Sequence, residues 1–470
     1  MIFDLLRPTP LLALVLLTGC ASLMPPTQVT APVAPAWQAP LPHQGSVAGL
    51  TDWWQAQGDP LLVDLITAAQ AVSPSVAQSL ARIEAARANQ ALARSALLPN
   101  LGIQASTSRG VGQPNNTLAT TSQVGLQAAW ELDLVGANRA VSNAALANVQ
   151  GTQALWHDAR VSVAAEVANR YHGLATCSRL LALADVDATS RGETARLTGI
   201  SAEAGFLAPA VAALARAGAA EARNRTTQQR TQCDLDTKAL VALTALPEPL
   251  LRQKMALAPV QPAPIATFSV ASVPVQAVSQ RPDVFAAERD VVVASAQVGS
   301  AQAQRLPRLS LNGSIGALRV SSGGADQNVS TWSFGPLAVS LPLFDGGARV
   351  AAVTSAQANY EASVAVYRSK VRQAVREVEE ALVTLQSTEA RARDAQVATQ
   401  GYAESRSATQ NRFDQGLASL VELEDARRQA LAAESAQLTL VLERQRAWVA
   451  LYRALGGGFD ANDGTPANTP

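Results

Sequence analysis

The sequence predicts a mixed α and β fold in which one plan, in the order helix, strand, strand, long helix and helix, occurs twice. Three observations support this prediction: an internal duplication, two long windows with helical periodicity, and two pairs of alternating segments. The duplicated positions are Leu98-Pro99-Asn100-Leu101 with Leu306-Pro307-Arg308-Leu309, Gly136 with Gly347, and Gly205 with Gly416. Solenoid repeats are only about 20 to 50 residues long, so this longer repeat indicates a duplicated, domain-sized unit with pseudo-twofold symmetry.

Two proline-free windows predict helices that are too long for a compact domain. No proline occurs between Pro114 and Pro209 or between Pro342 and Pro466. Within the windows, apolar residues step by three and four along one stripe from Val141 to Val167 and another from Tyr360 to Leu385, as on one face of a helix. A run of about 60 residues gives a helix roughly 90 Å long. Alanines flank both stripes and favour a closed cylinder of coiled-coil hairpins, an α-helical barrel. A soluble coiled-coil adaptor is the alternative.

Two pairs of alternating segments predict β-strands of about ten residues, the length of a tilted membrane strand. Their connecting loops, "GVGQPNNTLAT" and "RVSSGGADQNV", are polar and rich in glycine. The apolar positions of the first pair are Leu101, Ile103 and Ala105, then Val124, Leu126, Ala128 and Trp130. Those of the second pair are Leu309, Leu311 and Ile315, then Leu337, Val339 and Leu341, which follow Trp332 and Phe334.

Four strands per chain do not close a barrel, because the smallest membrane barrels have about eight strands. An open sheet edge is not tolerated in lipid. If the strands cross a membrane, several chains must therefore share one transmembrane β-barrel. The alternative is a pair of hairpins lying on a soluble sheet.

The N-terminus has the features of a secretory signal. Residues 1–19 contain Arg7 and the apolar run Leu11–Leu17, which is too short to span a bilayer. The sequence "LTGC" ending at Cys20 resembles a bacterial lipobox, which implies that Cys20 carries the lipid. The alternative is an ordinary signal peptide and an incidental cysteine. Ala21 follows Cys20 in place of aspartate, which by resemblance to sorted lipoproteins implies the outer membrane.

Composition and charge exclude several functional classes. The chain has 37 basic and 37 acidic residues, so no basic surface for nucleic acid is expected. Its three histidines, His43, His157 and His172, lack the spacing of metal ligands, and neither a phosphate loop nor a GxSxG motif occurs. We therefore expect a protein that is not an enzyme and that has neither a cofactor nor a metal.

Four stretches together resemble the TolC/NodT-type family of outer-membrane efflux lipoproteins. The most specific is "SQRPDVFAAERDVVVASAQVGSAQAQRLPRLSLNGSIG" at 279–316; the others are "DWWQAQGDPLLVDLI" at 52–66, "WSFGPLAVSLPLFDGG" at 332–347 and "LYRALGGG" at 451–458. The resemblance implies a homotrimer in which each chain gives four strands to an outer-membrane β-barrel, continuous with a periplasmic tunnel of helices. Asp283 within Arg281-Pro282-Asp283 is expected to accept hydrogen bonds from the first turn of a helix.

The family implies a passive exit duct for small molecules such as drugs. Its partners would be a periplasmic adaptor and an inner-membrane pump of the resistance-nodulation-division type. A duct for type I protein secretion and a non-conducting periplasmic scaffold lipoprotein are the alternatives. The expected organisation is a signal peptide at 1–19, a lipidated tether at 20–50, efflux repeats at 51–260 and 261–458, and a flexible tail at 459–470.

Two cysteines of the first copy are placed to form a disulfide. Cys177 and Cys233 lie at equal distances in sequence from Gly205, the expected turn of an antiparallel helical hairpin. The periplasm permits disulfides, so the two thiols are expected to meet. The alternative is a pair of unbonded core residues.

The second hairpin is expected to carry a gate at its periplasmic tip. In "RFDQGLASLVELEDARRQ" the resemblance to the tunnel end of the family, matched from Gly416, places the two acidic gate positions at Glu422 and Asp425. Asp414 lies on the turn itself and completes the expected gate. Threefold symmetry would make rings of carboxylates that attract cations, and repulsion within a ring would raise some of their pKa values. The alternative is an ordinary solvated helix face beside Arg427 and Arg428.

Overall fold

The computed structural model describes residues 24–34, 36–39, 50, 52–112, 117–257, 278 and 280–460. The chain forms two compact units. Unit 1 comprises 1–31, 81–153 and 286–369, and unit 2 comprises 32–80, 154–285 and 370–470. Both sequence copies contribute to both units, so the structural units do not coincide with the two repeats. Cys20 and the predicted signal peptide lie outside the described residues.

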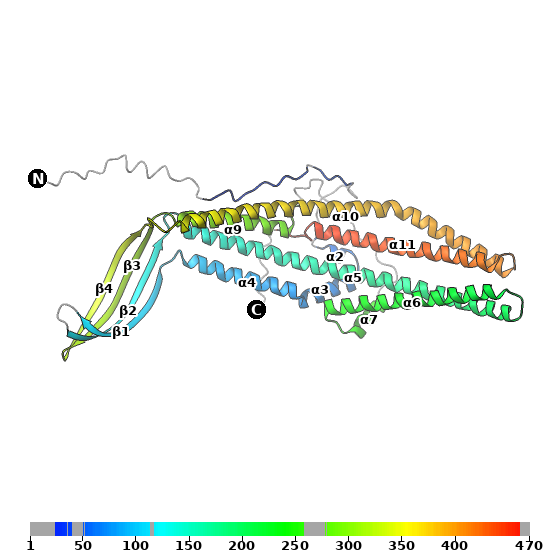
Figure 1. Cartoon of the computed structure of the whole chain (residues 1–470), viewed down its shortest axis with the longest axis horizontal. Coiled ribbons are helices and arrows are strands. Elements are labelled where there is room, and N and C mark those ends of the chain that lie inside the picture. Colours follow the sequence, from blue (N-terminus) through cyan, green and yellow to red (C-terminus); the bar gives the residue numbers. More distant parts are fainter. Residues whose placement is uncertain are drawn as a thin grey trace. The chain divides into compact units, whose positions relative to one another are not determined.

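Unit 1 contains a four-stranded antiparallel sheet with the order β1-β2-β3-β4 (Figure 1). Its strands are β1 (Asn100–Gly112), β2 (Thr117–Leu132), β3 (Arg308–Ser322) and β4 (Ala325–Ser340). Pro99 and Pro307 directly precede β1 and β3, where the preceding helical stretch ends because a proline disfavours helix at the residue before it. The pairing of β2 with β3 joins the two sequence copies in one sheet.

Two helices of 67 residues each, α5 (Ala137–Glu203) and α10 (Ala348–Asp414), confirm the prediction of long continuous helices. Each is about 100 Å long at 1.5 Å per residue. Gly136 and Gly347 precede them with φ angles of 79° and 90°. Glycine adopts this conformation without the steric penalty that other residues carry, which permits the change from strand to helix.

The predicted apolar stripe on α5 is wrong at its first position. Val141 is 43 % exposed, whereas Ala140 and Ala144 are buried in one cluster with Ala296 of α9 (Pro282–Ala303). Small side chains allow the two helices to approach closely. At the start of α5 the inward face is therefore formed by alanines rather than by the larger apolar residue.

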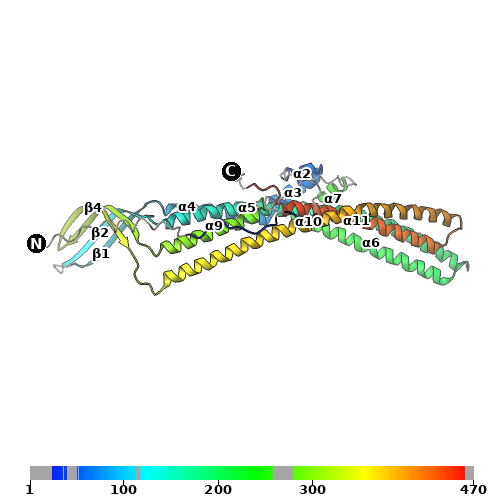
Figure 2. The same ribbon diagram turned by 90° about the horizontal axis from the view of Figure 1, so that it is seen from above.

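Each long helix forms a hairpin with the helix that follows it (Figure 2). Helix α5 pairs with α6 (Pro209–Thr244), and α10 pairs with α11 (Leu420–Ala454). The turns contain Gly205 and Gly416, with φ angles of 78° and 75°. A left-handed glycine that ends a helix lets the next amide return to a free carbonyl; here Phe206 N donates to Ser201 O at 2.9 Å.

Four shorter helices complete the described elements: α2 (Trp53–Ala56), α3 (Pro60–Val72), α4 (Pro74–Ser95) and α7 (Glu248–Leu257). Within the described residues no single helix is long and apolar enough to cross a membrane. Only α3 and α4 taken together, bent by 52° at their junction, reach that length and composition.

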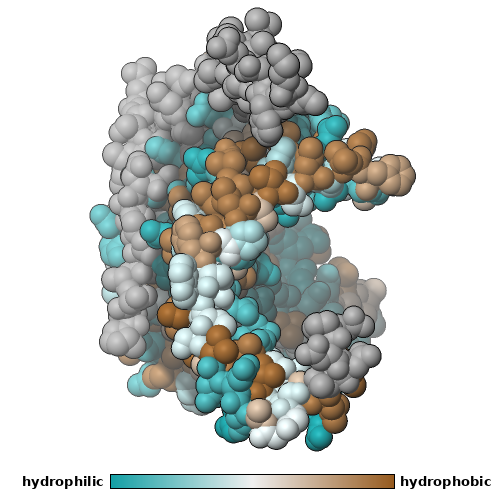
Figure 3. Space-filling model, turned by 90° about the vertical axis from the view of Figure 1, so that its left-hand side faces the viewer, coloured by the Kyte–Doolittle hydropathy of each residue, from teal (hydrophilic) through white to brown (hydrophobic). Residues whose placement is uncertain are grey.

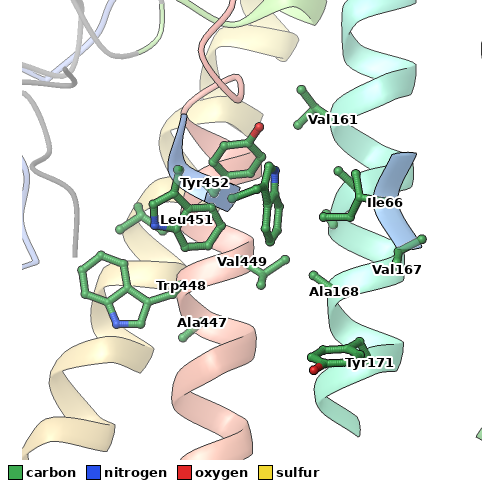
Figure 4. Packing of buried hydrophobic residues seen from close by; sticks show 14 of the residues in the cluster. Ile66, Val161, Val167, Ala168, Tyr171, Ala447, Trp448, Val449, Leu451 and Tyr452 are labelled. Carbon is green, nitrogen blue, oxygen red and sulfur yellow. The ribbon is translucent and has the colours of Figure 1, made fainter. Parts of the chain in front are cut away.

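The main core of unit 2 lies between α5, α11 and the helices α2 and α3 (Figure 4). The ring of Trp53 stacks on that of Tyr452 with centroids 4.8 Å apart. The Tyr171 hydroxyl donates to Asp59 Oδ2 at 2.7 Å. Leu451 is fully buried, so this cluster fixes α2, α3 and α11 against α5.

The described part of the predicted tether lies against helices. In unit 1, Ser295 Oγ donates to the Pro25 carbonyl at 2.6 Å and the Tyr360 hydroxyl donates to the Pro26 carbonyl at 2.8 Å. In unit 2, Glu379 accepts hydrogen bonds from the amides of Gln38 and Ala39. Backbone groups that no sheet satisfies are thus satisfied by helix side chains.

Candidate functional site

One face of the sheet is apolar along five consecutive rows of directly paired residues. Trp332 and Phe334 on this face are 79 % and 82 % exposed, so the chain itself does not cover them. We call this surface the apolar face. From the helix side, its rows are Leu132, Leu309 and Val339; Trp130, Leu311 and Leu337; Leu101, Ala128, Gly313 and Phe334; Ile103, Leu126, Ile315 and Trp332; and Ala105, Val124, Ala317 and Ser330.

A register shift in β4 keeps this face continuous. Trp332 and Phe334 are even-numbered, whereas Leu337 and Val339 are odd-numbered, so a regular strand would place the two pairs on opposite faces. The pairing shifts between Leu311 and Gly313 of β3. The extra residue on β4 reverses the alternation, as in a β-bulge, and both pairs therefore share one face.

The opposite face, which we call the polar face, carries amides and hydroxyls at the level of the apolar rows. One of its rows contains Gln127, Ser314 and Ser333, and the hydroxyls of the last two lie 2.8 Å apart. In the next row, a Cβ on Gly316 would lie only 2.5 Å from the Val124 carbonyl oxygen. At the end of the chain that carries the strands, hydrophobic residues gather over part of the surface, with hydrophilic and intermediate residues beside them (Figure 3).

The height of the apolar face matches that of a membrane-spanning band. Five rows span about 27 Å along the strands, or about 21 Å for strands tilted by ~40°. Membrane barrels have an apolar band about 25 Å tall. Strands β1 and β4 are the edges of the sheet, and each leaves one side without a partner in the single chain.

The predicted gate residues each have a partner on their own segment. Glu422 forms a capping box with Ser419 at the start of α11, and hydrogen bonding by Ser419 lowers the pKa of Glu422. Asp414 accepts a hydrogen bond from Gln410 at 2.8 Å, and Asp425 pairs with Arg428 at 2.9 Å. Within one chain, these local contacts account for the presence of the three carboxylates. A ring of carboxylates from several chains stays a prediction.

A buried ion network joins the two hairpins within unit 2. Arg191 of α5 pairs with Asp187 at 2.9 Å and with Glu424 of α11 at 3.5 Å. Glu424 also pairs with Arg427 at 3.0 Å and accepts a hydrogen bond from Thr194 at 3.3 Å. The sequence analysis did not identify this network, because spacings of three and four residues indicate pairs within one helix but not a partner on another helix.

The two cysteines of the first hairpin are bonded in the structure. The disulfide between Cys177 and Cys233 joins α5 to α6, with Cα atoms 5.6 Å apart. Both residues are buried. The turn at Gly205 places them at the same height because the two arms of the hairpin have equal length.

Arg281 connects three helices of unit 2. Its guanidinium binds both carboxylate oxygens of Asp283 at 2.9 Å and Glu377 of α10 at 2.7 Å, and it donates to the carbonyl of Ala454 in the last turn of α11 at 3.1 Å. The Asp283 carboxylate also accepts from the Val284 amide at 3.0 Å, within the first turn of α9. The Arg-Pro-Asp sequence therefore has a structural role in this unit.

Asp158 of α5 lies near this cluster. Burial raises its pKa, and the negative charge of Asp283 raises it further. Arg281, Arg453 and Lys370 act in the opposite direction but do not compensate fully. Burial acts to raise the Asp283 pKa, but the hydrogen bond and charge of Arg281, the charge of Lys370 and the hydrogen bond from the Val284 amide together lower it below its usual value.

Comparisons with known proteins agree with this architecture. A family model described as outer membrane efflux protein matches residues 65–246 and 273–457. Outer membrane protein OprJ of Pseudomonas aeruginosa is 30 % identical over 464 residues, which cover 95 % of each chain. The toluene efflux pump outer membrane protein TtgI of Pseudomonas putida is 29 % identical, over 97 % of this chain and 99 % of its own.

The fold is also similar to solved structures. The open state of the MtrE outer membrane channel of Neisseria gonorrhoeae superimposes with a TM-score of 0.80 at 26 % identity. The alignment covers 94 % of this chain and 99 % of MtrE.

Proposed function

The chain belongs to the outer membrane efflux protein family, and from this premise we propose that three copies form one passive duct. The protein is an outer-membrane component of an efflux system, as its relatives are. In the proposed trimer each chain gives four strands to a shared transmembrane β-barrel and two hairpins to a periplasmic α-helical barrel. The apolar face would contact lipid and the polar face would line the lumen.

The observation that carries this proposal is the amphipathic sheet with two unpaired edges. A sheet in lipid must have all its backbone groups paired, which requires closure. Four strands do not close, so β1 of one chain would pair with β4 of the next. The polar loops that connect β1 with β2 and β3 with β4 would then face the exterior.

The proposed partners are a periplasmic adaptor and an inner-membrane pump of the resistance-nodulation-division type, which supplies the energy. The proposed cargo is small and at least partly apolar, by analogy with a relative named for toluene efflux. The efflux relatives support this interpretation rather than a protein-secretion duct or a non-conducting scaffold. Acylation of Cys20 would add a lipid anchor to the barrel.

Fractionation and reconstitution of the full chain test the proposal. We expect the protein in the outer-membrane fraction, a native mass equal to three chains, and discrete conductance steps in planar bilayers. A monomer without conductance would contradict the duct. A trimer that remains outside the membrane fraction would contradict the assignment of the apolar face.

A further inference from the structure

The polar face changes character beyond the paired glycines Gly125 and Gly316, towards the loops. The next row on this face contains Leu318 and Val329, which are directly paired across β3 and β4, beside Gln123. The row after it contains Val320, paired with Gln327. We call Leu318, Val320 and Val329 the inner apolar cluster. Val329 is 45 % exposed, so the cluster is not sealed within the chain.

The apolar face changes in the opposite sense at the same level. Its row beyond Ala317 consists of Thr107, Ser122, Arg319 and Asn328. Arg319 is exposed and forms an ion pair with Asp326. The amphipathicity of the sheet thus inverts here. In the proposed trimer, the continuous apolar rows that contact lipid end at this level. The inner apolar cluster lies on the opposite face of the sheet, so it would not contact the membrane.

We propose that the inner apolar cluster is a contact site for the apolar part of amphiphilic cargo near the exit of the duct. The inference rests on the proposed function, which makes the polar face the lumenal face and places three such clusters around the lumen. Binding sites for small molecules combine apolar side chains with a few polar groups that orient the ligand. Gln123 and Gln327 in the same rows supply hydrogen-bonding groups for the polar part of the cargo.

Current blockade by an amphiphilic probe tests this site. Rhodamine 6G is added on the loop side of the reconstituted full-length trimer, and the mean dwell time of single blockades is measured. We expect Leu318→Asn combined with Val329→Asn to shorten the dwell time about tenfold, as for the loss of one buried aliphatic contact. Leu318→Met, which stays apolar, should retain the wild-type dwell time, as should Ala317→Ser on the opposite face.

The outcomes separate this site from the duct itself. If the wild-type trimer conducts and the Asn variants block for as long as wild type, the contact site is wrong and the duct stands. If Leu318→Met shortens the dwell time as much as the double substitution Leu318→Asn and Val329→Asn does, shape rather than polarity matters and the inference is overturned. Should the Asn variants fail to assemble, Val329→Thr keeps the side-chain shape, and an unchanged dwell time in it is equally decisive. If the wild type does not conduct, the proposed function fails first.

Discussion

Lysine substitutions at two adjacent residues of β3 test which face of the sheet contacts lipid. Ile315 lies on the apolar face, paired with Trp332, and is 61 % exposed in the single chain. Ser314 precedes it on the polar face, paired with Ser333. We expect Ile315→Lys to prevent stable membrane assembly and Ser314→Lys to permit it. The two variants carry the same new charge on the same strand, so each is the control for the other.

The expected penalty follows from the depth of the residue in the apolar face. Ile315 lies one row, about 7 Å along the strand, from the middle of the five rows. A lysine on the lipid face costs roughly 2 to 4 kcal/mol at the bilayer midplane. Because the penalty decreases away from the midplane, three chains in one trimer would lose up to roughly 6 to 12 kcal/mol, at most comparable to the whole stability of a typical domain. Ser314→Lys carries no such penalty, because its ammonium group stays in water.

The assay has two readouts. Heat-modifiable trimers are counted in outer-membrane fractions, and urea unfolding in lipid vesicles gives the free energy of unfolding. In planar bilayers, Ser314→Lys should also shift ion preference towards anions, because three lysines would line the lumen. If Ile315→Lys assembles as well as Ser314→Lys, or if ion preference changes only in Ile315→Lys, the assignment of the two faces is refuted.

Four further predictions concern other parts of the chain. Cys20→Ser should remove the lipid, seen by intact mass, while the trimer still inserts, because the strands and not the acyl chains span the membrane. Cys177→Ser should lower the free energy of unfolding by up to roughly 4 kcal/mol in the chain-entropy model; a non-reducing peptide map of the wild type showing free thiols would reject the bond. Glu422→Ala with Asp425→Ala should change conductance and weaken cation preference. Unchanged values would show that these residues only make local helix contacts and do not form the gate. The pKa of Asp158 is raised in the folded protein. Its contribution to the free energy of unfolding is therefore fully present below the unfolded pKa near 3.8 and is lost as pH rises through the folded pKa. Asp158→Asn should stabilise the protein near pH 7, and equal denaturation midpoints of variant and wild type at that pH would contradict this.

Local sequence patterns predicted the elements and several of their ends. The strands, however, have 13 to 16 residues instead of about ten and extend into the segments that were expected to be connecting loops. Pro99 and Pro307 mark the starts of β1 and β3, and Gly205 and Gly416 mark the hairpin turns, because backbone restrictions act on the residue itself and its neighbours. The alternation of the strands predicted the two faces of the sheet correctly. Equal arm lengths around Gly205 were sufficient to bring Cys177 and Cys233 together.

Features that depend on how helices and strands pack against one another could not be predicted from these local patterns. The buried side of α5 begins at Ala140 instead of Val141 because close contact with Ala296 of α9 favours the smaller residue. The register shift in β4, which places Trp332 and Leu337 on the same face of the sheet, can be recognised only once β3 is paired with β4.

Charged residues show most clearly which features the sequence determines and which only the tertiary structure decides. The pair of Asp187 and Arg191 has the i,i+4 spacing of a contact within one helix, but only the rotation of α5 against α11 brings Glu424 to the same guanidinium. The family resemblance predicts a gate at Glu422, and only the structure shows that within one chain its carboxylate accepts a hydrogen bond from the Ser419 amide. Hydrophobic periodicity is a property of consecutive residues, so it can be recognised whatever the element packs against. A salt-bridge partner from another helix is set by the relative rotation of the two helices, which only the tertiary structure decides.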